Sequence, residues 1–155
     1  MLLSELFSPR DLVVPFDPSD KWAAIRDLVQ HLVTASRIDA DQVGEVMEAV
    51  LSREKSMSTG MERGVAIPHA AVDHLESVAA SLGVVTREGG LSFESVDGQP
   101  ARFVVLLAIP RAQKLLHIRT LADVARALSR DELRSDLLAA ADSEEAYQVF
   151  ARAER

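Results

Sequence analysis

The chain has 155 residues, 48% of them hydrophobic and 26% charged, so one globular domain spanning residues 1–155 is expected. Its 17 basic and 24 acidic residues give a formal charge of −7, which argues against nucleic acid as a partner because phosphate backbones bind basic surfaces. With no cysteine, no signal-peptide pattern and no apolar run of the ~20 residues that a spanning helix needs, the chain is expected in the cytoplasm, without membrane insertion.

Two helices are predicted in the first third of the chain, after a short irregular lead. Apolar residues recur at helical spacing over residues 18–36, and Asp17 or Ser19 is expected to cap that helix. The same periodicity over residues 40–54 predicts a second helix, with Asp41 as its cap.

The middle of the chain is predicted to form strands. Residues 70–77 are expected to be a linker or short turn, followed by strands over residues 78–86 and 91–95 with glycine-containing turns around them. Residues 103–109 are continuously apolar, which is typical of a strand buried on both faces in the centre of a sheet.

The last part of the chain is predicted to be helical. A helix over residues 112–129 is expected to bury an apolar face that includes Leu115 and Ile118. Shorter helices follow over residues 131–140 and from residue 143 onward, the last one capped by Ser143. The succession of helices and strands predicts an α/β (α+β) fold, with a mixed sheet covered by helices.

The most informative stretch runs from residue 53 to residue 70. It leaves a helix, passes through small and hydroxylated residues, and ends in a short apolar run followed by Pro68 and His69. Because proline fixes its own φ and favours extended geometry in the residue before it, His69 is expected to emerge from the end of a strand, exposed and held by a stiff backbone. A side chain presented in this way suits chemistry.

Several kinds of chemistry are open to a histidine, and the sequence narrows them. A metal site is disfavoured because the chain has no cysteine and no second histidine at ligand spacing beside His69. A serine hydrolase is disfavoured because the Gly-x-Ser-x-Gly motif is absent. A histidine beside a loop rich in N–H and hydroxyl donors suits an anion such as phosphate, although by spacing alone an ordinary turn is the more common interpretation.

Three segments together resemble a known family. They are Arg53-Glu54-Lys55, Ser58-Thr59-Gly60 and Gly64-Val65-Ala66-Ile67-Pro68-His69. They are similar to the signature of the enzyme IIA domains of the bacterial phosphotransferase system, in the mannitol/fructose superfamily, and most similar to its nitrogen-regulatory branch. The resemblance extends over nearly the whole chain and implies a mainly five-stranded mixed sheet with helices on both faces.

The resemblance also implies a site and a partner. It implies that His69 receives a phosphoryl group from a phosphorylated HPr-like carrier, with no metal or other cofactor, because phosphohistidine is already a reactive donor. By its position alone Arg53 complements the dipole of the helix that it ends, and His117 is an ordinary surface histidine. The resemblance instead places Arg53, His117 and the loop of Ser58, Thr59 and Gly60 around the transferred group, where they offset its charge.

The sequence leaves the next step of the relay open. A nitrogen-type enzyme IIA acts on regulatory target proteins, whereas a sugar-transport enzyme IIA passes the group to a IIB domain; the resemblance favours regulation. A third hypothesis is a binding module that never carries phosphate. It rests on departures from the family pattern, namely Ala70 where the family has glycine, and the charged pair Glu62-Arg63.

Overall fold

The strands form one mixed sheet in the centre of the molecule. The computed structural model describes residues 2–154, apart from the side chain of residue 114. Over these residues the sheet has five strands, which are β1 (Leu12–Val13), β2 (Val65–Ala66), β3 (His69–Val72), β4 (Ala79–Val84) and β5 (Phe103–Pro110). Their order is β1-β4-β5-β2, and β3 also pairs with β5. Only the β4–β5 pair is antiparallel, so the sheet is mixed, as predicted.

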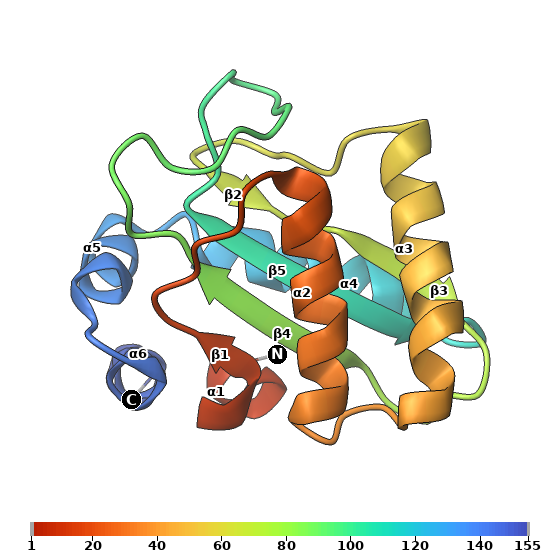
Figure 1. Ribbon diagram of the computed structural model, residues 1–155. Coiled ribbons are helices and arrows are strands. Elements are labelled where there is room, and N and C mark those ends of the chain that lie inside the picture. The colour runs from red at the N-terminus through yellow and green to blue at the C-terminus, as the bar shows by residue number, and fades with distance from the viewer. Residues whose placement is uncertain (1, 155) are drawn as a thin grey trace.

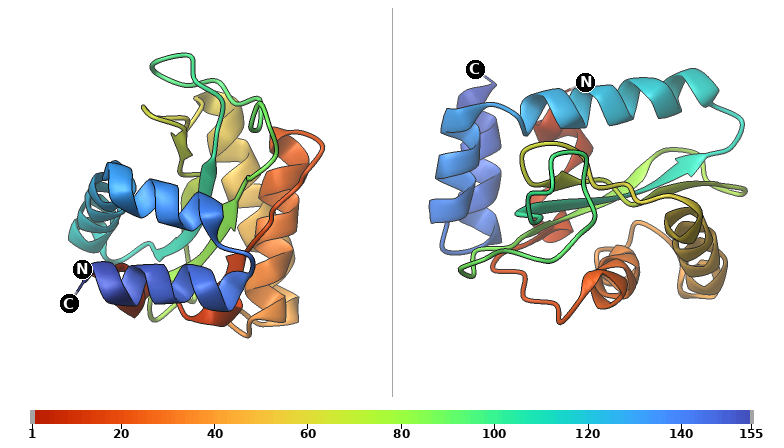
Figure 2. Two further views of the ribbon diagram at one scale, coloured as in Figure 1. Left: turned by 90° about the vertical axis from the view of Figure 1, so that its left-hand side faces the viewer. Right: turned by 90° about the horizontal axis from the view of Figure 1, so that it is seen from above.

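Helices cover both faces of this sheet. On one face lie α2 (Lys21–Thr34) and α3 (Val43–Ser56), and α4 (Lys114–Ala127) lies on the other (Figures 1 and 2). The last two helices, α5 (Asp131–Ala139) and α6 (Ser143–Ala153), pack together at one side, next to the short α1 (Leu3–Leu6). Two 3-10 turns complete the chain, η1 (Pro9–Asp11) and η2 (Ala40–Gln42). Helices on both faces confirm the predicted fold class.

The central strand β5 divides the hydrophobic core in two. Val104, Leu106 and Ala108 face the helices α2 and α3, whereas the alternate residues from Phe103 to Ile109 face α4, α5 and α6. Successive side chains of a strand point to opposite faces, and every residue of β5 is buried. The prediction of a strand buried on both sides is therefore confirmed.

The helix caps differ from those predicted. The carboxylate of Asp20 accepts a hydrogen bond from the N–H of Ala23 at 2.8 Å and caps α2, because α2 begins later than predicted, at Lys21. Asp39 rather than Asp41 starts the turn η2 that leads into α3. Asp142 likewise caps α6, one residue before the predicted cap Ser143.

Two predictions in the middle of the chain are wrong. Residues 70–77 are not simply a linker, because β3 occupies their first part and pairs with β5. Residues 91–95 make only an isolated bridge, Leu91 with Ala101, and the segment instead belongs to the loop that connects the end of β4 to the start of β5 (Figure 1). Alternation of apolar residues cannot distinguish a strand from a loop that buries Leu91 and Phe93.

The apolar face predicted for α4 is partly exposed. Leu115 and Ile118 have 79% and 68% of their surface exposed, whereas Thr120, Val124 and Leu128 are fully buried. At about 100° per residue, Leu115 lies half a turn away from Val124, so one face of α4 cannot bury both. The α4 segment therefore presents two large apolar side chains to its surroundings, on either side of His117 in the sequence.

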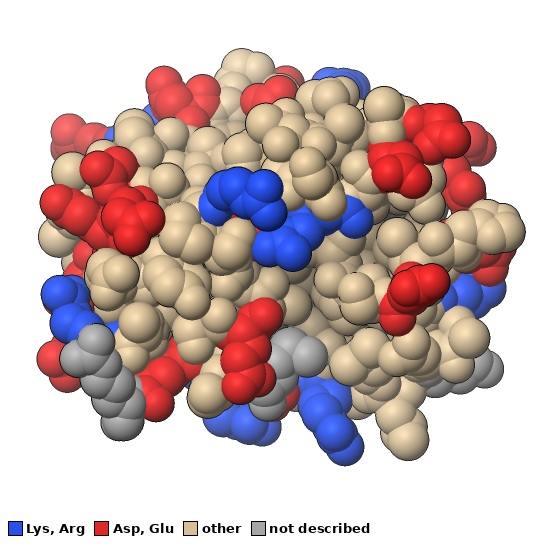
Figure 3. All heavy atoms as spheres, turned by 90° about the horizontal axis from the view of Figure 1, so that it is seen from below, with Lys and Arg blue, Asp and Glu red and all other residues tan. Residues whose placement is uncertain are grey.

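Charge is dispersed over one face of the molecule. Seen from below, acidic side chains are scattered over the face, and the largest group of Lys and Arg atoms lies near its middle (Figure 3). Within residues 2–154, no helix is long and apolar enough to cross a bilayer.

Candidate functional site

His69 lies on the edge of the sheet, at a point where the strand pairing is interrupted by a proline. Val65 in β2 opposes Phe103, and His69 in β3 opposes Leu107, so β2 and β3 keep one register along β5. Pro68 has no N–H to donate, but its carbonyl accepts a hydrogen bond from the N–H of Leu107 at 3.0 Å. His69 therefore opens a second strand, where the sequence predicted the end of one.

The alternating direction of side chains along β2 and β3 determines which face of the sheet the His69 ring occupies. Val65 and Ile67 point into the core on the α4 side of the sheet, and His69, two residues after Ile67, points to the same side. Because β2 and β3 form an edge of the sheet, groups at the end of α3 on the opposite face can also approach the ring.

One nitrogen of the His69 ring has a fixed partner. Nδ1 lies 2.7 Å from the carbonyl oxygen of Ile67. A carbonyl oxygen only accepts hydrogen bonds, so Nδ1 carries the proton, and in the neutral ring Nε2 is unprotonated. The local backbone thus selects the tautomer in which Nε2 holds the free electron pair.

The ring is also more enclosed than the sequence suggested. His69 is 9% exposed, where an exposed side chain was expected. Burial lowers the pKa of His69, because it disfavours the charged ring. The hydrogen bond to the Ile67 carbonyl acts in the opposite direction. The positive charge of Arg53 and the nearby His117 lower the pKa further, and the negative charge of Glu54 raises it. The neutral ring, which is the nucleophilic form, is favoured at neutral pH.

His117 stands beside His69. It lies in the first turns of α4, and the centroids of the two imidazole rings are 5.2 Å apart with an angle of 78° between their planes. The predicted pair of imidazoles is therefore brought together by tertiary structure, from residues far apart in the sequence. Because the Nδ1 proton of His69 is bonded to Ile67, the His117 ring is the one that could donate a hydrogen bond to an anion at Nε2 of His69.

Arg53 approaches from the other face, in the last turn of α3. Its Nη1 donates a hydrogen bond to the carbonyl of Met57 at 2.9 Å, just beyond the end of the helix. It thus serves the helix end, as its position alone indicated, and its charge also reaches the His69 ring, whose pKa it lowers.

The loop of Ser58, Thr59 and Gly60 is tightly bound to its neighbours. The Ser58 hydroxyl donates to the carbonyl of Glu94 at 2.6 Å, and Thr59 donates both its N–H and its hydroxyl to the carboxylate of Glu54. Gly60 packs so closely that an added Cβ would lie 1.9 Å from the carbonyl oxygen of Glu94. These bonds hold the loop in its conformation. The contact of the loop with a phosphoryl group stays a prediction.

The residues that depart from the family pattern, Glu62, Arg63 and Ala70, can be located in the structure. Arg63 adopts a φ of 60° and pairs with Asp131, while its Nη1 donates to the carbonyl of Ser129 at 2.6 Å. Its charge is therefore committed to the start of α5. Ala70 is buried in β3 opposite Ala108, and Glu62 is exposed.

Sequence reasoning named Glu54 only as part of a motif, without a role, and did not single out Lys21. Glu54 is 2% exposed and forms an ion pair with Lys21 at 3.3 Å. A signal was present, because Glu54 follows Val46 and Val50 at intervals of four on the buried stripe of α3, where a carboxylate needs a partner. Among the described residues, no group of three or more His, Asp or Glu could hold a metal ion.

The chain also matches a known protein family. Residues 5–153 match the family described as "Phosphoenolpyruvate-dependent sugar phosphotransferase system, EIIA 2". The chain belongs to the EIIA 2 family. It is therefore an EIIA domain, a phosphoryl-transfer component of that system, and the predicted resemblance to the mannitol/fructose type is confirmed.

Relatives with different names have similar sequence identity to this EIIA domain. It is 30% identical to a "Nitrogen regulatory protein" of Bradyrhizobium diazoefficiens over 97% of the chain and 95% of that protein. It is 38% identical to the Escherichia coli "Nitrogen regulatory protein" over 68% of the chain and 64% of that protein. It is also 32% identical to the "PTS system fructose-specific EIIABC component" of Bacillus subtilis over 94% of the chain, which spans only 22% of that larger protein.

Solved structures show the same EIIA fold. The crystal structure of nitrogen regulatory protein IIA-Ntr from Neisseria meningitidis superposes with a TM-score of 0.80 and 22% identity, covering 96% of this chain and 98% of that one. Enzyme IIA for mannitol from Escherichia coli, in its complex with phosphorylated enzyme IIB, gives a TM-score of 0.76 and 20% identity, with 94% and 97% covered.

Proposed function

We propose that this EIIA domain accepts a phosphoryl group on Nε2 of His69 from a phosphorylated HPr-like carrier. The observation that supports this assignment is the hydrogen bond from Nδ1 to the carbonyl of Ile67, which leaves Nε2 as the nucleophile. His117 lies next to that ring and Arg53 at the edge of the same site.

The transfer needs no change of redox state and no metal. The electron pair of Nε2 forms a bond to phosphorus as the N–P bond of the carrier's phosphohistidine breaks, and the carrier's imidazole leaves with the electrons of that bond. In the product the His69 ring keeps its proton on Nδ1, so Ile67 stabilises both states. Arg53 and His117 are placed to offset the charge of the phosphoryl oxygens, and catalysis is mainly positioning and electrostatics.

The carrier is expected to dock over the exposed apolar side chains beside the site. Leu115 and Ile118 flank His117 in the sequence, and Met57, 69% exposed, follows the helix that ends near Arg53. Large apolar groups that a folded protein leaves exposed mark surfaces for protein partners.

We propose further that the domain acts in the cytoplasm and in regulation, as a nitrogen-type enzyme IIA that signals to target proteins by its phosphorylation state. The support is that a relative named for nitrogen regulation matches over almost its full length. Transfer to a IIB domain for sugar uptake is the alternative, because a fructose-specific relative is equally similar. Rapid loss of the phosphoryl group to a IIB domain, coupled to sugar, would favour that alternative.

The acceptor is tested by intact-mass spectrometry with phosphoenolpyruvate, enzyme I and the carrier. The wild-type domain should gain one phosphoryl group, and His69→Ala should gain none. His74→Ala, at an exposed histidine in the loop after β3, is the matched control and should be labelled normally. Labelling of the His69→Ala variant would refute the assignment. A wild-type domain that stays unlabelled, and whose partners bind His69→Ala and His69→Asp equally, would instead identify a binding module without phosphate.

A further inference from the structure

A buried ion pair lies behind the site. Lys21, the first residue of α2, has its Nζ 3.3 Å from Oε2 of Glu54, and the Glu54 side chain is fully buried while that of Lys21 is 11% exposed. The ammonium group also lies 4.9 Å from the ring centroids of Trp22 and Phe93. Removing two charges from water is costly, so such a pair persists only when its geometry and hydrogen bonds are well satisfied.

The carboxylate of Glu54 reaches the loop that precedes β2. Its Oε2 accepts the backbone N–H of Thr59 at 2.7 Å, and its Oε1 accepts the Thr59 hydroxyl in a short hydrogen bond. Together with Lys21, the two oxygens therefore have three donors. A side chain of α3 thereby fixes Thr59, at the far end of the segment that leaves the helix.

Hydrogen bonds continue from Thr59 to the acceptor histidine. The carbonyl of Thr59 accepts the N–H of Ile67 at 3.2 Å, and the carbonyl of Ile67 is the group that accepts the Nδ1 proton of His69 at 2.7 Å. Ile67, whose carbonyl selects the ring tautomer, is thus itself held through its N–H by Thr59. Every link in this series is a contact between neighbouring groups, from Lys21 to the imidazole.

We propose that Glu54 is a positioning residue that, with Lys21 and through Thr59 and Ile67, fixes the orientation and tautomer of the His69 ring. The proposal rests on the proposed function for its catalytic consequence, but the ring geometry it describes is independent of phosphate. A buried carboxylate suits this role because an ionised acceptor makes stronger hydrogen bonds than a neutral one, so the loop is held in one arrangement. Arg53, the residue before Glu54, is set in place by the same turn of α3.

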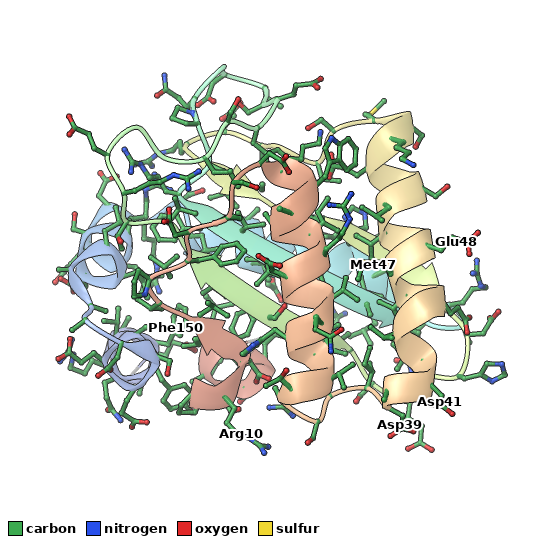
Figure 4. The ribbon with its side chains drawn as sticks, viewed as in Figure 1. Arg10, Asp39, Asp41, Met47, Glu48 and Phe150 are labelled. Atoms are coloured by element: carbon green, nitrogen blue, oxygen red, sulfur yellow. The ribbon has the colours of Figure 1, made fainter. Side chains whose placement is uncertain are left out.

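The test measures the tautomer of His69 directly by ¹⁵N NMR on the full chain without phosphate, and then the rate of phosphoryl acceptance. In the wild type, Nδ1 should be protonated and Nε2 not. Glu54→Gln should convert His69 to a mixture of tautomers and lower the acceptance rate about 10- to 100-fold, the range for lost outer-shell support or a misplaced reacting group. Glu48→Gln, at an exposed residue on the outer side of α3 (Figure 4), is the matched control and should change neither quantity.

A second pair of variants guards against unfolding of Glu54→Gln. Thr59→Val removes only the hydroxyl bond to Glu54 and should shift the tautomer in the same direction, and Thr59→Ser should restore it. A Glu54→Gln or Thr59→Val protein that is folded and keeps both the wild-type tautomer and the wild-type rate would overturn the proposal. If the wild type accepts no phosphoryl group, the proposed function fails, while the tautomer measurement still decides the role of Glu54.

Discussion

At the scale of single residues, the tautomer and the protonation state of the His69 ring depend on its surroundings. A hydrogen bond to its own backbone, two residues back, selects the tautomer, and burial lowers its pKa. The two effects act together, because a neutral ring with Nδ1 protonated is the form that can attack phosphorus through Nε2.

The lowered pKa predicts how the reaction depends on pH. The rate constant for phosphoryl acceptance should stay level as the pH falls to about 6.5, the pKa of an unperturbed histidine, and should decline only at lower pH, where the buried ring finally binds a proton. Arg53→Met should raise the pKa of His69, because it removes a positive charge that disfavours protonation. Arg53→Lys, which keeps a charge, should raise it less.

NMR titration of the His69 ring signals measures this pKa in each variant. A pKa that is unchanged or lower in Arg53→Met would show that the guanidinium does not act on the ring. The Lys variant separates charge from shape, because lysine cannot make the planar two-point contacts that arginine offers to phosphate oxygens. It should accept the phosphoryl group more slowly than the wild type even though its charge is retained.

At the scale of elements, α4 packs on the sheet with one face and leaves large apolar side chains exposed on another. Thr120, Val124 and Leu128 anchor it on the sheet, while Leu115 and Ile118 remain exposed near His117. Under the proposed function, the helix would therefore carry one site residue and two apolar groups for the carrier on the same rigid body. That arrangement keeps the distance between docking surface and site constant.

Ile118→Lys tests the docking role of this face. It should slow phosphoryl transfer from the carrier protein several-fold, because it places a charge where apolar contact is expected, while transfer from a small donor such as phosphoramidate should fall much less. Ala122→Lys, on an exposed position one turn further along α4, is the comparison within the helix. An equal loss with both donors would place the effect of Ile118→Lys on the chemistry and not on docking.

At the scale of the whole molecule, the two ends of the chain close on each other. Phe7 stacks on Phe150 with ring centroids 6.0 Å apart, and the Tyr147 hydroxyl donates to the carbonyl of Ser4 at 3.1 Å. Figure 4 shows Phe150 on α6, next to the N-terminal segment. The last helix is therefore part of the core on the α4 side of the sheet.

Phe150→Ala should destabilise the domain by about 3–5 kcal/mol, because it empties a fully packed position and removes the contact with Phe7. Tyr147→Phe, which removes only a partly buried hydroxyl bond, should cost about 1 kcal/mol. Urea unfolding followed by circular dichroism measures both. A loss in Phe150→Ala no larger than that in Tyr147→Phe would mean that α6 is not an integral part of the core.

Features that depend on a local pattern of residues could be predicted from the amino-acid sequence. Continuous apolar residues identified β5, helical periodicity located α2, α3 and α4, and the proline before His69 marked the stiff backbone at the site. The cap residues were misplaced by one to three positions, because several Asp and Ser residues near each helix start can accept the same N–H groups. The resemblance to enzyme IIA supplied the remaining site residues.

The contacts between residues far apart in the chain could be seen only in the folded structure. The pairing of β3 with β5 turns His69 toward α4 and so toward His117, and the packing of α2 on α3 brings Lys21 to the buried carboxylate of Glu54. The folded structure also decided that Leu115 and Ile118 stay exposed, because a helical stripe of apolar residues does not state how much of it the sheet can cover. Such contacts join residues far apart in the chain, and no local pattern encodes them.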